Sequence, residues 1–235
     1  MKLLKMSLLL LLSSAVVYAT NLSNKELSQL KAFTDIKATI TGNQLIGKNL
    51  DLYLVKGIDG TGRPFSIVTD KDGKYLVLTD NVFDTAKKAP ITIPVDVTPL
   101  KGKQLFTYGT GKDEYFVFTD PECPYCHKFE AGWPKVKDKV KFHVFFFNLD
   151  FHKNANAMSR WILSAKTDEE KAKRLNAVGN GDKSYENAKY SKEEEAKLNA
   201  LMENTKELGK KLGVQGTPAV YDTKGNVVNW PEIIK

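Results

Sequence analysis

The spacing of apolar residues near the start of the chain predicts an amphipathic helix over residues 22–33. Ser23 and Glu26 have the spacing of a capping box, in which each side chain satisfies a backbone N–H of the other residue. Apolar residues then recur on one face of this helix, at Leu27, Leu30 and Phe33. The segment should therefore begin with a capped helix.

The apolar period changes to two over residues 36–80, which predicts an antiparallel meander. Three runs of strand-forming residues, at 50–55, 65–69 and 75–79, are separated by turns that contain glycine. A helix and a sheet of about 60 residues form a marginal core by themselves. We therefore interpret residues 20–80 as a module that needs a partner surface.

A proline-containing connector follows at residues 81–103, and we interpret it as a semi-rigid linker with a short helix. Residues 104–108 and 114–119 are then predicted to be strands. Residues 141–148 are too apolar to face water and predict a central strand. Because a helical segment separates the last two strands, they should form a right-handed βαβ unit with a parallel pair.

Residues 153–212 have mostly helical spacing, which Asn180 and Gly181 interrupt and Gly213 ends as a C-cap. These helices fall between two strands of one fold. We therefore interpret them as a helical insertion, at about residues 150–213, and not as a third domain.

The candidate chemistry lies where the strand at 116–119 meets a helix. The strand ends at an Asp-Pro pair, and a C-P-Y-C motif at residues 123–126 begins the helical segment. A helix start offers free N–H groups and a positive dipole end to a thiolate, and Pro124 fits the first helical position. The sequence predicts a lowered pKa for Cys123, with Cys126 in reach to form or resolve a disulfide, an arrangement suited to thiol–disulfide exchange.

Three other interpretations of these cysteines remain open. A zinc site needs about four ligands, and besides the cysteines the chain offers only three histidines: His127, His143 and His152. The run C-x-x-C-H that ends at His127 also satisfies the attachment pattern of c-type haem. A purely structural disulfide would close so short a loop that it constrains little of the unfolded chain.

Residues 1–19 have the features of an export signal. Lys2 and Lys5 give it a positive start, an apolar run follows over residues 6–17, and small residues precede a cleavage position after Ala19. The apolar run is shorter than the ~20 residues of a spanning helix, which argues against a membrane anchor. Export would place both cysteines in an oxidising compartment, and we expect no stable membrane insertion.

The net charge of the chain does not alter this interpretation. The formal net charge of +7 becomes +5 when Lys2 and Lys5 leave with the signal. The lysines alternate with glutamates on the predicted helices, which is typical of solvated faces, so we expect no nucleic-acid binding.

The chain resembles the thioredoxin-like superfamily, in which C-x-x-C follows a strand and a late Thr-Pro precedes another. It is most similar to periplasmic thiol:disulfide interchange proteins of the DsbC/DsbG type, on the run from Phe118 to Lys128, on residues 217–220 and on the order of segments. This resemblance implies an α+β protein. A thioredoxin-like catalytic domain with the helical insertion would span residues 104–235, and a small cystatin-like α+β dimerisation domain would span residues 20–80.

The resemblance also implies roles for single residues. Cys123 is expected to be the exposed nucleophile, and Cys126 the more buried resolving thiol. Pro218 is expected to be a cis-proline that packs against the cysteine pair. The residues expected to contact substrate are Pro124, Tyr125, Thr217 and Pro218. Many thioredoxin-like proteins place a buried carboxylate six residues before the first cysteine; Val117 stands there, so we expect no such base.

The activity that the resemblance implies is that of a disulfide isomerase or reductase. It would reshuffle wrong disulfides in misoxidised or unfolded periplasmic proteins, and a chaperone role could accompany it. A DsbD-like electron donor at the inner membrane would re-reduce the cysteines, and no cofactor or metal is expected. The alternatives are a dithiol oxidase that donates disulfides and a haem-binding electron carrier.

We also predict a homodimer joined through residues 20–80. A meander ends in edge strands with unpaired N–H and C=O groups, which a symmetry mate can satisfy. The predicted edges are Thr39 to Leu45 and Phe65 to Thr69. The alternative is a monomer whose N-terminal module packs on its own thioredoxin-like domain.

Overall fold

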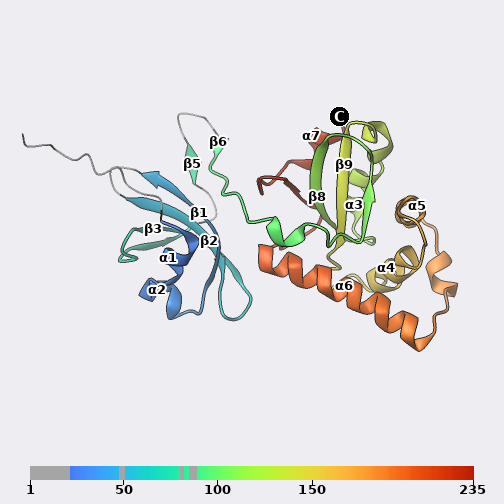
Figure 1. The fold of residues 1–235 in the computed structure, drawn as a ribbon, viewed down its shortest axis with the longest axis horizontal. Coiled ribbons are helices and arrows are strands. Elements are labelled where there is room, and N and C mark those ends of the chain that lie inside the picture. Colours follow the sequence, from blue (N-terminus) through green and yellow to red (C-terminus); the bar gives the residue numbers. More distant parts are fainter. Residues whose placement is uncertain (1–21, 48–50, 80–81, 85–88) are drawn as a thin grey trace, which may run out of the picture.

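The computed structural model describes residues 22–47, 51–79, 82–84 and 89–235. The predicted export signal lies outside the described residues, as does part of the predicted linker. A four-stranded sheet with two short helices forms one body, and a larger domain forms around a second four-stranded sheet (Figure 1). This confirms the predicted α+β class.

The predicted N-terminal helix forms as two short helices, α1 (Asn24–Ser28) and α2 (Lys31–Thr34). The capping box is confirmed. The N–H of Glu26 donates to Oγ of Ser23 at 3.2 Å, and the N–H of Ser23 donates to the Glu26 carboxylate at 2.7 Å. The continuous helix of the prediction breaks at Leu30, whose backbone is extended (ψ 138°).

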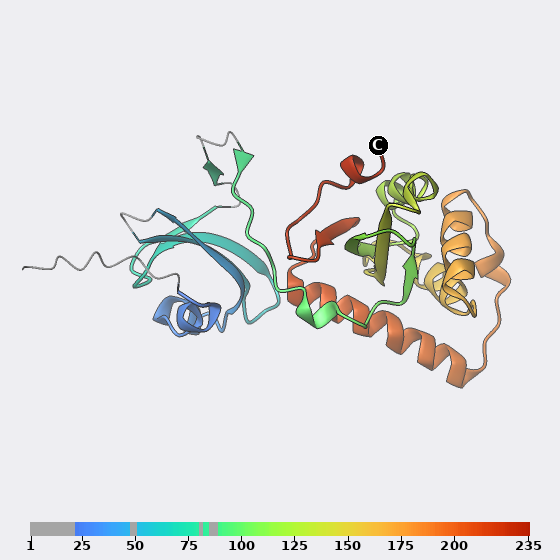
Figure 2. The ribbon, with the colours of Figure 1, turned by 45° about the horizontal axis from the view of Figure 1, so that its top comes forward.

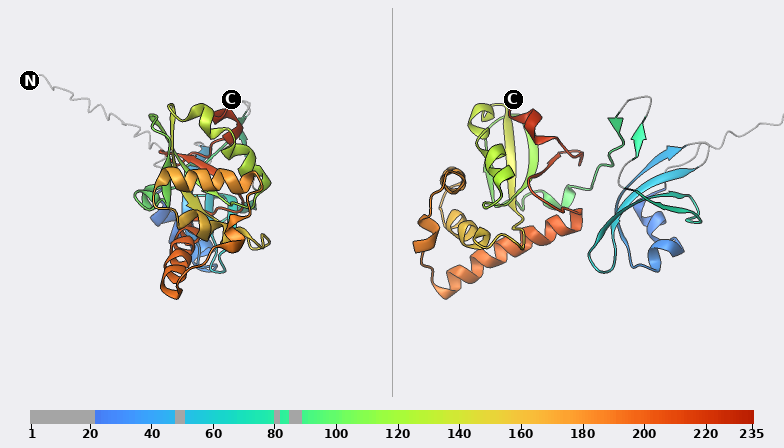
Figure 3. Two further views of the ribbon diagram at one scale, coloured as in Figure 1. Left: turned by 90° about the vertical axis from the view of Figure 1, so that its right-hand side faces the viewer. Right: turned by 180° about the vertical axis from the view of Figure 1, so that it is seen from behind.

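The N-terminal sheet is an antiparallel meander in the order β1-β2-β3-β4. Its strands are β1 (Thr39–Gly47), β2 (Leu52–Ile58), β3 (Pro64–Asp70) and β4 (Leu76–Leu78). Both helices lie against one face of this sheet (Figure 3). The buried residues between them are Leu27, Phe33, Ile40, Tyr53, Val55 and Ile67.

One predicted edge of this sheet is wrong. β1 is an edge strand, as predicted. Phe65 to Thr69, however, lies within β3, which pairs with both β2 and β4. The second edge is therefore β4, because the last of the three expected runs pairs with the outer side of β3 and so ends the sheet.

The connector between the two bodies is packed against both of them. Ile93 is 1% exposed and lies so close to Gly42 that a Cβ on this glycine would be 2.7 Å from it. The N–H of Val95 donates to the carbonyl of Gly225 at 2.9 Å. The predicted linker is therefore docked, not solvated along its length. Its short elements are β5 (Phe83–Asp84), β6 (Ala89–Pro90) and the 3₁₀ helix η1 (Thr98–Leu100).

The second sheet has the order β10-β8-β9-β7. Its strands are β7 (Phe106–Tyr108), β8 (Asp113–Thr119), β9 (Val140–Phe146) and β10 (Ala219–Asp222). β8 and β9 are parallel, as predicted, and β7 and β10 flank them in antiparallel orientation. Side chains of β8 and β9 contribute to apolar clusters on both faces, as expected of central strands.

Helices cover both faces of this sheet. The helices are α3 (Pro124–Glu130), η2 (Trp133–Val136), α4 (Ala155–Leu163), α5 (Asp168–Gly179), η3 (Ser184–Asn187), α6 (Lys192–Leu212) and α7 (Trp230–Ile233). Four of them, α4, α5, η3 and α6, form the predicted insertion between β9 and β10. α6 runs from the insertion to the connector (Figure 2). Gly209 allows α6 to pack closely on Phe147, because any larger residue would place a Cβ 2.5 Å from the phenylalanine ring. In the described ranges, no helix is both long and apolar enough to cross a membrane.

Candidate redox-active site

The C-P-Y-C motif lies at the junction that the sequence predicts. β8 ends at Thr119, and Cys123 is the N-cap of α3, with Pro124 at the first helical position. The N–H of Cys123 donates to the carbonyl of Asp120 at 3.0 Å, which turns the chain between strand and helix. The Cys123 sulfur therefore faces the free N–H groups of the first helical turn.

Both cysteines are free thiols in this structure. Cys126 is fully buried, as expected of a resolving thiol. Cys123 is only 3% exposed, so the expectation of an exposed nucleophile is wrong for this state. The cause is the loop before β10, because the carbonyl of Thr217 lies 3.4 Å from Sγ of Cys123 and covers it. Tyr125, in contrast, is 63% exposed.

The two thiols have opposite acid–base character. The pKa of Cys123 is lowered to about 5, first because the Cys126 thiol hydrogen-bonds its sulfur and then because the N–H groups of Cys126 and Tyr125 do so. Burial raises the pKa of Cys126 far above that of a free thiol, and the bond to Cys123 adds to this. At neutral pH the pair is a thiolate at Cys123 held by a protonated Cys126.

The predicted cis-proline is present. The Thr217–Pro218 bond is cis, and the loop that contains it lies against Cys123. Oγ1 of Thr217 is buried and has no hydrogen-bond partner among the described residues. The structure thus brings together Cys123, Cys126, Thr217 and Pro218, with Pro124 and Tyr125 exposed beside them.

A buried carboxylate lies next to the cysteines, contrary to the expectation drawn from Val117. Glu130, on α3, is 3% exposed, and the hydroxyl of Thr119 donates to its Oε1 at 2.6 Å. Its Oε2 is buried without a partner in the described part of the chain. The acid comes from the helix and not from the strand, so the position of Val117 did not reveal it.

Glu130 interacts electrostatically with both sulfurs. Its pKa is raised to about 8, chiefly by burial and also by the charges of Cys123 and Asp120, which together outweigh the lowering effect of the Thr119 hydrogen bond. Its charge in turn raises the pKa of Cys126. A spacing signal existed in the sequence, because Glu130 follows Cys126 by four residues and therefore lies on the same face of α3.

The comparisons with known proteins agree with this geometry. The model of the family described as "Thioredoxin-like domain" matches residues 107–231. The chain belongs to the thioredoxin-like family.

The solved structures that match the chain resemble it only loosely. Helicobacter pylori DsbG is 14% identical, with 80% of this chain and 96% of that chain covered and a TM-score of 0.41. BdbD of Bacillus subtilis is 17% identical over 56% and 87% of the two chains, with a TM-score of 0.43. A disulfide interchange protein of Neisseria gonorrhoeae is 25% identical over 54% and 89%, with a TM-score of 0.40. No curated protein matches the sequence.

The residues around His127 fit c-type haem poorly in this thioredoxin-like domain. Nε2 of His127 lies 2.7 Å from the carbonyl of Pro121 and forms a hydrogen bond with it. Cys126, which haem attachment would modify, is fully buried. Within the described ranges, no three His, Cys, Asp or Glu side chains are grouped as metal ligands.

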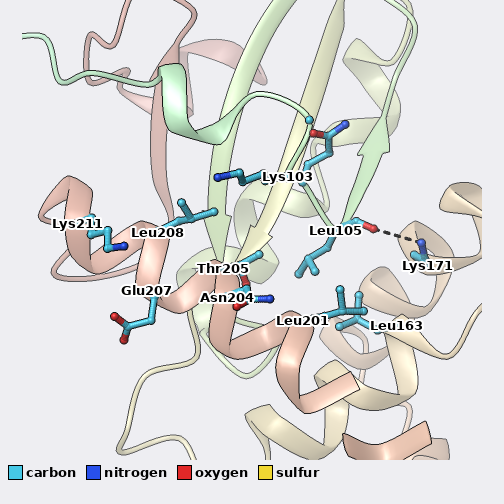
Figure 4. Close-up of a pocket in the computed structure, with 12 residues that line it drawn as sticks. Lys103, Leu105, Leu163, Lys171, Leu201, Asn204, Thr205, Glu207, Leu208 and Lys211 are labelled. Atoms are coloured by element: carbon cyan, nitrogen blue, oxygen red, sulfur yellow. Dashed lines mark hydrogen bonds between the residues drawn. The ribbon is translucent and has the colours of Figure 1, made fainter. Parts of the chain in front are cut away.

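A cavity of about 590 Å³ lies on the thioredoxin-like domain away from the cysteines. Figure 4 shows it between the chain before β7 and one face of α6, with Leu163 and Leu201 at one end and Lys211 towards the other. Neither cysteine nor the cis-proline loop lines it. The redox chemistry therefore lies at the rim of the sheet and not in this cavity.

We predict that Cys123 reacts as a thiolate well below neutral pH. In the reduced native protein, the rate of alkylation should rise with a midpoint near pH 5, because the Cys123 thiolate is the reacting form. Cys126 should not contribute to this rate, because it is fully buried. Mass spectrometry of peptides would assign the modified residue. In Cys126→Ala, the midpoint should move upward, since this variant lacks the strongest hydrogen bond to the sulfur. A wild-type midpoint at about 8.5, the value of a free thiol, would refute the assignment.

We predict that the contribution of Glu130 to the stability of the reduced protein falls as pH rises from 4.5 to about 8. The unfolded chain releases this proton near 4.5 and the folded chain keeps it to about 8, so the unfolded state is favoured between these values. Relative to wild type, Glu130→Gln should gain about 1.4 kcal/mol per pH unit in this window. Denaturant unfolding at several pH values measures it.

Glu207→Gln is the matched control for this experiment. Its carboxylate accepts a hydrogen bond from Lys210, which lowers its pKa, so the stability difference between Glu207→Gln and wild type should be constant from pH 4.5 to 8 and change only at acid pH. A constant stability difference between Glu130→Gln and wild type from pH 4.5 to 8 would contradict the prediction.

Proposed function

We propose that the protein is an exported disulfide isomerase and reductase of the DsbC/DsbG type that reshuffles wrong disulfides in misoxidised or unfolded periplasmic proteins. The observation that carries this proposal is the asymmetry of the dithiol. Cys123 is held as a thiolate, and Cys126 is held as a buried thiol beside it. Such a pair can attack a client disulfide with one sulfur and resolve the product with the other. The export signal predicted at residues 1–19 is the basis of the proposed location.

The first step is an attack by the Cys123 thiolate on one sulfur of the client disulfide. A new S–S bond joins Cys123 to the client as the old S–S bond breaks, and the other client sulfur leaves as a thiolate. No electrons are gained or lost overall. A low pKa at Cys123 keeps the nucleophile ionised and also makes it a good leaving group when a client thiol attacks back.

Two routes then release the client. In isomerisation, another client thiolate attacks the client sulfur of the mixed disulfide and expels the Cys123 thiolate. In reduction, Cys126 loses its proton and attacks the sulfur of Cys123, so that the client leaves reduced and the enzyme is oxidised. A DsbD-like dithiol partner at the inner membrane would return two electrons and two protons to it.

Glu130 is the proposed proton acceptor for Cys126 in the second route. Its carboxyl is linked to Thr119 by a 2.6 Å hydrogen bond, and its free oxygen has no other described partner. Its pKa of about 8 lies close to physiological pH, and formation of the mixed disulfide removes the Cys123 charge that helps to raise this pKa, which favours the carboxylate that can accept a proton. Cys126 needs such a base, because burial strongly disfavours its thiolate.

A dithiol oxidase is the second candidate function. The observation that favours it is the pKa of about 5 at Cys123, because a stabilised thiolate favours the reduced enzyme and so makes the disulfide form more oxidising. A haem-binding electron carrier is not favoured, because His127 and Cys126 are engaged as described above.

The test of function starts from matched reduced and oxidised samples of the mature chain. The reduced chain should restore a client whose disulfides were scrambled, Cys123→Ala should not, and Cys126→Ala should keep part of this isomerisation while losing net reduction. In freshly trapped cells the cysteine pair should be mainly reduced. A pair that is mainly oxidised in cells, with faster oxidation of a reduced client than isomerisation, would establish the oxidase instead.

We further propose that the protein is a homodimer joined through its N-terminal body, and β4 is the favoured contact. β4 is an edge strand, and its apolar side chains face solvent on both sides. The exposed fractions are 48% for Leu76, 57% for Val77 and 82% for Leu78. Tyr75, directly before the strand, is 64% exposed. An exposed apolar edge of this kind pairs readily with another strand, and a second copy would supply one. Two catalytic domains would then share a client, which could also support a chaperone role.

We predict that Leu78→Lys separates this dimer. A lysine on an edge strand disfavours edge-to-edge pairing because its charge would have to be desolvated. Light scattering at micromolar concentration should give the mass of two mature chains for wild type and of one chain for the variant. The control is Ile36→Lys, since Ile36 is 46% exposed on the same body but outside the strands. A monomer mass for wild type would rule out the dimer.

A further inference from the structure

Two exposed aromatic side chains belong to segments at the sheet edge that carries the redox pair. Phe151 is 74% exposed and Tyr125 is 63% exposed. Among the described residues from 104 onward, the other exposed large apolar side chains are Leu201, at 38%, and Val227, at 54%, and neither is aromatic. Single exposed apolar residues are common on proteins, so their exposure alone indicates nothing. Their position relative to Cys123 is the informative feature.

The topology of the sheet places Phe151 on one side of Cys123 and Thr217 on the other. β8 lies between β9 and β10. The loop after β9, which holds Phe151, is at the same sheet edge as Cys123, because β9 runs parallel to β8. The loop with Thr217 precedes β10 and is at this edge too, because β10 runs antiparallel to β8. Cys123 therefore lies between the two loops.

The loop that holds Phe151 is fixed to the turn that precedes Cys123. Asp120, which is fully buried, accepts hydrogen bonds from the N–H of Leu149 at 2.7 Å and from Nδ1 of His152 at 2.8 Å. The N–H of Asn154 donates to the carboxylate of Glu122 at 2.6 Å. Both ends of the loop at residues 149–154 are therefore hydrogen-bonded to the segment that precedes Cys123.

The Phe151 ring itself has little packing. It contacts the ring of His152 edge to face, with centroids 4.5 Å apart, and otherwise faces solvent. An apolar ring on a fixed loop loses little conformational freedom when a ligand covers it, so most of the gain from burial is available for binding. Tyr125 presents a second ring, with Nζ of Lys128 5.4 Å from its centroid.

We propose that Phe151, with Tyr125, binds apolar side chains of the client polypeptide next to the disulfide under attack. The client would cross Cys123 with one flank at Thr217 and the other at Phe151. The enzyme would then prefer disulfides flanked by aromatic or large aliphatic residues, which are exposed when a client is misfolded. This inference rests on the proposed thiol–disulfide exchange and names its substrate preference.

The test compares three disulfides as substrates of the reduced, full mature chain. Two are peptides with the same disulfide, flanked by Phe and Leu in one and by Gly and Ser in the other, and the third is oxidised glutathione. In a single turnover of the reduced chain, Phe151→Ser should lower the second-order rate constant for the apolar peptide about tenfold relative to that for glutathione, as expected from the loss of one buried aromatic contact. Phe151→Leu should keep most of the preference.

The control is Val227→Ser, because Val227 is 54% exposed on the hairpin after β10 and lies outside the candidate site. It should leave all three rates unchanged. If Phe151→Ser changes no rate, or lowers all three equally, the inference is wrong while the proposed function stands. If the wild-type chain reduces none of the three disulfides, the proposed function fails and the inference fails with it.

Discussion

The hydrogen bonds that reach the Cys123 sulfur are the interaction on which the redox site depends. They come from the Cys126 thiol and from N–H groups at the start of α3, and they hold the pKa of Cys123 near 5. The same geometry keeps Cys126 protonated, because its thiol is a donor to a neighbouring anion and is itself fully buried. The start of one short helix therefore determines the protonation states of both the nucleophile and the resolving thiol. The rest of the fold serves to hold that helix start against the sheet edge.

The helical insertion contributes to the chemistry as well as to the fold. Leu175 and Val178 of α5 belong to the apolar cluster that contains Phe129 of α3, so the insertion covers the helix that carries the cysteines. This cover keeps Glu130 out of water and raises its pKa. The thioredoxin-like domain consequently has an acid beside its dithiol even though Val117 occupies the strand position where such an acid was expected.

The parts of the site that depend on local sequence were predictable, and those that depend on long-range packing were not. The strand, the C-P-Y-C helix start and the cis Thr217–Pro218 bond follow from adjacent residues and from the family resemblance. Glu130 was missed because a charged residue on a helix is usually exposed, although its spacing from Cys126 placed it on the buried face. The tie between Asp120 and His152, 32 residues apart, and the edge position of β4 depend on how separate segments pack, which no local pattern determines.

The most direct test of the account is to find which cysteine forms the mixed disulfide. Reduced protein would be mixed at neutral pH with a small amount of a peptide disulfide, quenched with acid after a short time, and analysed by mass spectrometry of its fragments. The account predicts that the trapped peptide is attached to Cys123, and that Cys123→Ala traps none on this timescale while Cys126→Ala accumulates the adduct. Attachment at Cys126, or equal attachment at both residues, would contradict the assignment of a thiolate to Cys123 and of a protonated, buried thiol to Cys126.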